Sequence, residues 1–104
     1  MSAKPQVIVT VLYHQKPDLK LDMDYYLGHH IPLTNATWGP LGMVSCDVCK
    51  PEDDSEFALK VVMAWKNIDA WKIAQAAEDS KKIEADYKNF TNGDFIAIVG
   101  KVVS

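Results

Sequence analysis

Four segments of the chain are rich in β-branched and other apolar residues, which predicts four β-strands. The segments are residues 6–14, 42–50, 56–66 and 95–103. One face of the first segment carries Val7, Val9, Val11 and Tyr13, and the other carries Ile8, Thr10, Leu12 and His14. Because both faces are largely apolar, we expect this strand to lie inside a sheet and to be covered on both sides.

Helical spacing of apolar residues follows the first and third segments. Asp22 is a suitable N-cap for the first helix, on which one stripe carries Met23, Tyr26, Leu27, His30 and Thr34. Pro32 lacks a backbone N–H and its ring crowds the carbonyl of Gly28, so we expect a kink or stop near His30 and an irregular continuation to Trp38. Asn67 can cap a second helix, and residues 80–87 are expected to form a separate short one.

The predicted order is therefore β-α-β-β-α-β in a single α+β domain over residues 1–104, which is the ferredoxin-like arrangement. Two helices cover one face of such a sheet and leave the other open. An open apolar face needs a partner. We expect a second copy of the chain to meet it by two-fold symmetry, so that a homodimer encloses a barrel-like interior between two sheets. That interior is either filled by side chains or holds a small apolar molecule.

Charge and composition narrow the class of partner. The formal net charge is −3, and all 11 basic residues are Lys. Without Arg or a basic face, we expect no nucleic-acid partner. We expect no membrane span and no signal peptide, and therefore a cytoplasmic protein. Cys46 and Cys49 form a Cys-x-x-Cys, but flanking residues typical of a strand place them on opposite faces, so two unpaired thiols are expected.

Three histidines are the candidate acid–base groups. His30 lies one helical turn after Tyr26, so the two side chains can meet, and the hydroxyl could orient the imidazole or bind a substrate oxygen. His14 ends the first strand, where a cavity could open. His29 points away from His30 on an ideal helix, but Pro32 disturbs the helix here, so which of the two faces inward stays open.

A motif in the first helix resembles the EthD family, named from a bacterial gene cluster for ethyl tert-butyl ether degradation. Residues 25–33 read Tyr-Tyr-x-x-x-His-x-Pro-Leu, and residues 86–91, Asp-Tyr-Lys-Asn-Phe-Thr, also resemble the family. The resemblance implies a dimeric α+β barrel of ferredoxin-like protomers and makes His30 the motif histidine. Many relatives have Pro where this chain has His14.

The resemblance leaves the function open between classes, because relatives with this barrel include cofactor-free cyclases, dehydratases and decarboxylases as well as haem-degrading monooxygenases. The first hypothesis is a cofactor-independent lyase or cyclase acting on an apolar, oxygenated, polyketide-like molecule. The alternative is a non-catalytic binding or accessory protein, and a monooxygenase is a distant third. The catalytic candidates are His30, Tyr26 and His14. The ligand-binding candidates are Tyr13, His29, Leu33, Trp38 and Trp65. We expect neither a metal nor a cofactor.

Overall fold

Four antiparallel strands form one sheet in the computed structural model, which describes residues 4–104. The strands are β1 (Val7–His14), β2 (Met43–Cys49), β3 (Phe57–Trp65) and β4 (Phe95–Lys101). Their order in the sheet is β2-β3-β1-β4, so β1 lies between β3 and β4. This topology confirms the ferredoxin-like α+β fold class and the internal position of β1.

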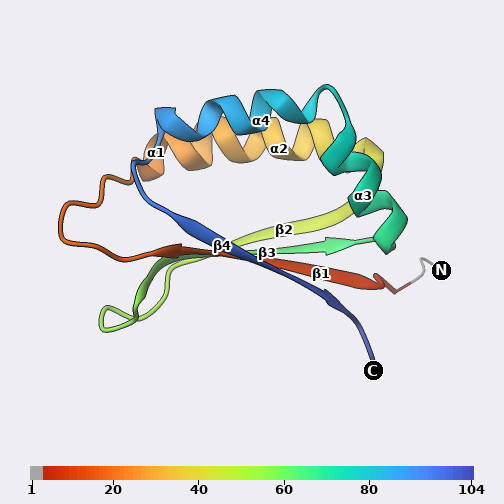
Figure 1. Ribbon diagram of the computed structural model, residues 1–104, viewed down its shortest axis with the longest axis horizontal. Coiled ribbons are helices and arrows are strands. Elements are labelled where there is room, and N and C mark those ends of the chain that lie inside the picture. The colour runs from red at the N-terminus through yellow and green to blue at the C-terminus, as the bar shows by residue number, and fades with distance from the viewer. Residues whose placement is uncertain (1–3) are drawn as a thin grey trace.

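All the helices lie on the same face of this sheet (Figure 1). They are α1 (Met23–Tyr25), the π-helical turn η1 (Tyr26–His30), α2 (Ile31–Trp38), α3 (Ile68–Ala76) and α4 (Ser80–Asp86), with 3₁₀ turns η2 (Gly39–Leu41) and η3 (Tyr87–Asn89). The expected caps are present, because the side chains of Asp22 and Asn67 accept hydrogen bonds from the backbone N–H groups of Tyr25 and Ala70. In Figure 1, α1, α2 and α4 run side by side above the strands, and α3 lies towards the end of the sheet where both chain termini emerge.

The first helix does not stop at His30. It passes through η1, in which the backbone N–H of Ile31 bonds to the carbonyl of Tyr26, and then continues regularly to Trp38. The wide turn places Pro32 in the first turn of α2, where a missing N–H removes no helical bond. The expectation of an irregular continuation was therefore wrong. The same turn leaves Leu27 half exposed, although Tyr26, His30 and Thr34 are buried as the stripe predicts.

Along β1 and β3, the face of the sheet that carries Val9, Tyr13 and Trp65 packs against the helices and is buried, whereas Phe95 and Val99 on the same face of β4 are exposed. We call the opposite face the open face; it carries Ile8, Thr10, Leu12, Val62, Ile96 and Ile98, and also Lys60 and Asp47. Residues 4–104 place no helix over it, and β1 is only half-buried there. Ile96 and Ile98 of β4 are 42% and 54% exposed. A single copy of the described chain therefore leaves a largely apolar surface over β1 and β4 uncovered.

Candidate functional site

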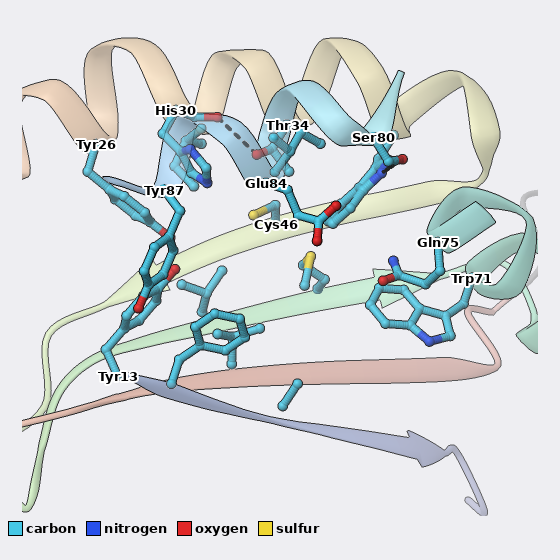
Figure 2. A pocket seen from close by; sticks show the side chains of 18 residues that line it. Tyr13, Tyr26, His30, Thr34, Cys46, Trp71, Gln75, Ser80, Glu84 and Tyr87 are labelled. Atoms are coloured by element: carbon cyan, nitrogen blue, oxygen red, sulfur yellow. Dashed lines mark hydrogen bonds between the residues drawn. The ribbon is translucent and has the colours of Figure 1, made fainter. Parts of the chain in front are cut away.

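A cavity of about 520 Å³ lies between the helix layer and the sheet. Figure 2 shows the side chains that line it, which come from the strands below and from the helices above. The sequence placed a cavity between the sheets of two protomers; the structure instead contains one inside a single chain. Large side chains separate the layers at both ends, where Tyr26 lies over Tyr13 and Trp38 over Trp65. Between them the strands present short side chains such as Val11 and Ala97, which leave the space unfilled.

One end of the cavity is aromatic. The ring centroids of Tyr13 and Tyr26 are 6.2 Å apart, and Tyr87 stacks on Tyr13 at the same distance. The hydroxyl groups of Tyr13 and Tyr26 interact. Burial is the main reason that the pKa of Tyr13 rises to about 12 and that of Tyr26 rises further. Both phenols therefore remain protonated at neutral pH. Because each phenol has a single proton, one hydroxyl donates to the other and the second can donate to a ligand.

His30 lines the same end of the cavity and is held by a carboxylate from another helix. Its ring lies 5.3 Å from that of Tyr26 and nearly parallel to it. Nδ1 of His30 lies 2.9 Å from Oδ2 of Asp86, and both side chains are buried. Burial lowers the pKa of His30 and outweighs the opposing effect of Asp86. The imidazole is therefore neutral at pH 7.

Asp86 itself is fixed by two further donors. The Tyr25 hydroxyl donates to Oδ1 at 2.5 Å, and Nδ2 of Asn89 donates to the same oxygen at 3.0 Å. Burial alone would raise the pKa of Asp86, but hydrogen bonds from Tyr25, Asn89 and His30 prevail and lower it to about 2. Asp86 is therefore a carboxylate, which can only accept hydrogen bonds.

These contacts determine the tautomer of His30. Because the Asp86 carboxylate only accepts, the proton of the neutral imidazole must reside on Nδ1, and Nε2 carries the lone pair. Nε2 has no hydrogen-bond partner among residues 4–104, and His30 faces the cavity (Figure 2). A neutral imidazole with an orienting carboxylate and a free lone pair can act as a general base.

The other end of the cavity is formed by tryptophan side chains and a few polar groups. Trp38, Trp65 and Trp71 pack edge to face, with centroids 5.2–6.0 Å apart. The Ser80 hydroxyl accepts from Nε1 of Trp38 and donates to a backbone carbonyl, so its hydrogen bonds are internal. Gln75 and Glu84 also line the cavity.

The structure brings together four of the residues that the sequence proposed. His30, Tyr26, Tyr13 and Trp38 all line the cavity. The other four do not line it. His14 lies on the sheet face opposite to Tyr13, beside Phe57, and His29 is largely exposed. Leu33 lines a second pocket, bordered by α2, η2 and the segment before α4, and Trp65 is fully buried against the other tryptophans. The open choice between His29 and His30 is thus resolved geometrically, since His30 faces inward.

Sequence reasoning assigned no role to Asp86, Tyr25 or Glu84. The Asp-x-x-Asn-Phe segment was noted as part of the resemblance, and it contains both Asp86 and Asn89, but nothing in the sequence links it to His30. Cys46 lines the cavity and Cys49 is exposed, and both are free thiols. Within residues 4–104 no three His, Cys, Asp or Glu side chains are grouped as metal ligands, and no helix there is long and apolar enough to cross a membrane.

Comparison with known proteins gave matches among solved structures only. No protein-family model matches the chain, and no curated protein matches it. An EthD-like protein from Ralstonia eutropha JMP134 superposes with a TM-score of 0.84 at 19% identity, over 98% of this chain and 96% of that one. An ethyl tert-butyl ether degradation family protein from Bacillus halodurans C-125 superposes with a TM-score of 0.73 at 21% identity, over 94% of this chain and 99% of that one.

This chain has the fold of EthD-like proteins. The similarity extends over nearly the whole length of each chain, so the fold expected from the helix motif is confirmed. SnoaB, a cofactor-independent oxygenase from Streptomyces nogalater, is more distant, with a TM-score of 0.59 at 14% identity over 97% of both chains. Fold similarity at these identities does not assign a reaction, which has to be argued from the site itself.

Proposed function

We propose that the chain is a cofactor-independent enzyme that binds an apolar, oxygenated small molecule and moves a proton with His30. The observation that carries this proposal is the buried His30–Asp86 pair, which directs the lone pair of Nε2 towards an apolar cavity. A cavity of about 520 Å³ has the size of a small-molecule site.

Abstraction of a proton next to a carbonyl is the chemistry that fits these groups. Nε2 of His30 would take the proton from the carbon, and the C–H electron pair would move into the carbonyl to give an enol or enolate. One hydroxyl of the Tyr13–Tyr26 pair would donate a hydrogen bond to the developing oxyanion while the other donates to its partner's oxygen, and the bond to the oxyanion strengthens as charge builds. Asp86 would stabilise the imidazolium. In a cyclisation the enolate carbon would attack a second carbonyl of the substrate to form the new C–C bond, and the proton on His30 would pass to the resulting alkoxide. In a dehydration the enolate electrons would expel a hydroxyl group from the neighbouring carbon, and the proton on His30 would leave with it as water. These are the reactions of a cyclase or a lyase.

The test is deuterium exchange into 2-tetralone, a bicyclic aromatic ketone, in D₂O. Wild-type protein is expected to accelerate exchange at the carbon next to the carbonyl, and His30→Ala to reduce that acceleration by about 10²–10⁴-fold, the usual contribution of a positioned base. His14→Ala is the matched control, because His14 lies on the other face of the sheet. Unchanged exchange in a folded His30→Ala variant would refute the proposal.

A non-catalytic binding protein is the second candidate, because most of the residues that line the cavity are apolar. It requires that 2-tetralone binds and that exchange stays at the background rate. Oxygenation is the third candidate and is supported by the fold shared with SnoaB. Uptake of dioxygen during turnover would favour it over proton transfer.

We also propose that the open face pairs with that of a second copy. The face is continuous across three strands, since Thr10 pairs with Val62 on one side and with Ile98 on the other. Soluble proteins rarely leave an apolar sheet face uncovered. A two-fold dimer would bury this face against itself and leave the cavity on the helix side of each protomer intact.

A further inference from the structure

Glu84 is an acidic residue among those that line the cavity. Ser80, Ile83, Glu84 and Tyr87 line it and follow the i, i+3, i+4, i+7 spacing of a single helix face. Ser80 and Ile83 are buried, whereas Glu84 is exposed, so its carboxylate lies at the rim of the cavity. Glu84 is therefore placed to meet a ligand from the solvent side of the site.

The Glu84 carboxylate has no hydrogen-bond partner among residues 4–104, whereas its polar neighbours are satisfied. The Ser80 hydroxyl bonds to Trp38 and Ala74, and the Tyr87 hydroxyl donates to the carbonyl of Gly93. Figure 2 shows the Glu84 carboxylate pointing down from the helix into the cavity, between the His30 end and Gln75. Glu84 is exposed, so water hydrates its oxygens when no ligand is present, and a ligand donor can replace that water.

Charge in the cavity has one sign. Glu84 is the one acid that lines it, and no Lys is among the described lining residues. A ligand carboxylate placed here would meet a like charge and no cation, which is unfavourable in a partly desolvated site. A neutral ligand with an O–H or N–H would instead donate to a charged acceptor, which is a stronger bond than one between neutral groups.

We infer that Glu84 recognises a hydrogen-bond donor on the substrate, at a point in the cavity between the carbonyl that faces His30 and the tryptophan end. This inference rests on the proposed function for the placement of the carbonyl, and it names the substrate class as a neutral, hydroxylated aromatic ketone. The apolar floor below these polar groups receives the rings. In β1 and β3 this floor runs from Tyr13 to the level of Met63, four residues of strand or roughly 13 Å, which suits two or three fused rings.

The test compares 6-hydroxy-2-tetralone with 6-methoxy-2-tetralone, which have the same ring system, the same ketone and a similar size. Only the hydroxy compound offers a donor at the far end. Their dissociation constants are measured by titration calorimetry for wild type, Glu84→Ala and Glu78→Ala. Glu78→Ala is the matched control, because it removes the same charge from a residue that is largely exposed and lies outside this cavity.

Wild type and Glu78→Ala are expected to bind the hydroxy compound about 3–10-fold more tightly than the methoxy compound. This preference is smaller than a hydrogen bond to a buried carboxylate would give, because water also solvates Glu84. Glu84→Ala is expected to bind both equally. Equal binding by wild type, a preference that survives in Glu84→Ala, or failure of both ketones to bind would overturn the inference. If His30→Ala loses deuterium exchange but wild type binds the hydroxy and methoxy ketones equally, the role of Glu84 is refuted and the assignment of His30 as the base still holds.

Discussion

Asp86→Asn is expected to invert the tautomer of His30. In the native chain Oδ1 of Asp86 accepts from both Tyr25 and Asn89, while Oδ2 accepts from Nδ1–H of His30. An Asn side chain has a single acceptor oxygen. Two donors compete for the Oδ1 site and one for the Oδ2 site, so the amide oxygen should take the Oδ1 site and the amide NH₂ should face Nδ1. Nδ1 would then have to accept, and the proton would move to Nε2.

The loss of activity follows from this change. With a proton on Nε2 there is no lone pair in the cavity, and the deuterium exchange of 2-tetralone should fall by about 10²–10⁴-fold, as for removal of the base itself. Stability should fall less, because the amide retains hydrogen bonds at both sites. We expect a loss of about 1.5–3 kcal/mol, the usual contribution of a hydrogen bond to a charged group.

Two measurements separate these effects. Urea denaturation reports the free energy of unfolding, and long-range ¹H–¹⁵N spectra of the imidazole report which ring nitrogen carries the proton. Glu84→Gln makes the same acid-to-amide change on the same helix but leaves the contacts of His30 intact, so its His30 spectrum should match that of wild type. A folded Asp86→Asn variant with an unprotonated Nε2, or with exchange within twofold of wild type, would refute the reasoning.

Four further outcomes are expected. Because burial lowers the pKa of His30 below its ordinary 6.5, the exchange rate should fall as the solution is acidified, with a midpoint below pH 6.5, which a pH–rate profile checks. The lowered pKa of Asp86, about 2 against 3.8, means that its contribution to stability is complete above pH 3.8 and is lost as pH falls through 2, which acid denaturation of wild type and Asp86→Asn compares. Tyr26→Phe should reduce exchange by about 10²–10³-fold through loss of an oxyanion donor, with folding checked by circular dichroism. Ile98→Lys, on the open face, should weaken a dimer by about 100-fold or more in analytical ultracentrifugation, because the symmetric interface would bury two charges.

The strands and the two helix caps could be read from the sequence because they depend on local rules. Alternation along residues 6–14 separates the two faces of β1, and Asp22 and Asn67 satisfy backbone donors only three residues away. The contact of Tyr26 with His30 is local in the same way, since it follows from i,i+4 spacing.

The remainder of the site depends on contacts between distant segments. Asp86 is 56 residues from His30, and no periodicity links the two. The position of the cavity depends on which large side chains meet across the layers, such as Trp38 with Trp65, and single-chain patterning does not specify such pairs. The π-helical turn ends two residues before Pro32, and the spacing of apolar residues along the helix does not specify it.

The most direct test of the central claim is a crystal structure of the wild-type protein with 2-tetralone. The proposed function requires the ketone to lie in the cavity between the helices and the sheet, with the carbon next to its carbonyl about 3–3.5 Å from Nε2 of His30 and its oxygen within hydrogen-bond distance of Tyr26 or Tyr13. A ketone bound on the open face, or in the cavity with its carbonyl directed away from His30, would contradict the assignment of His30 as the base.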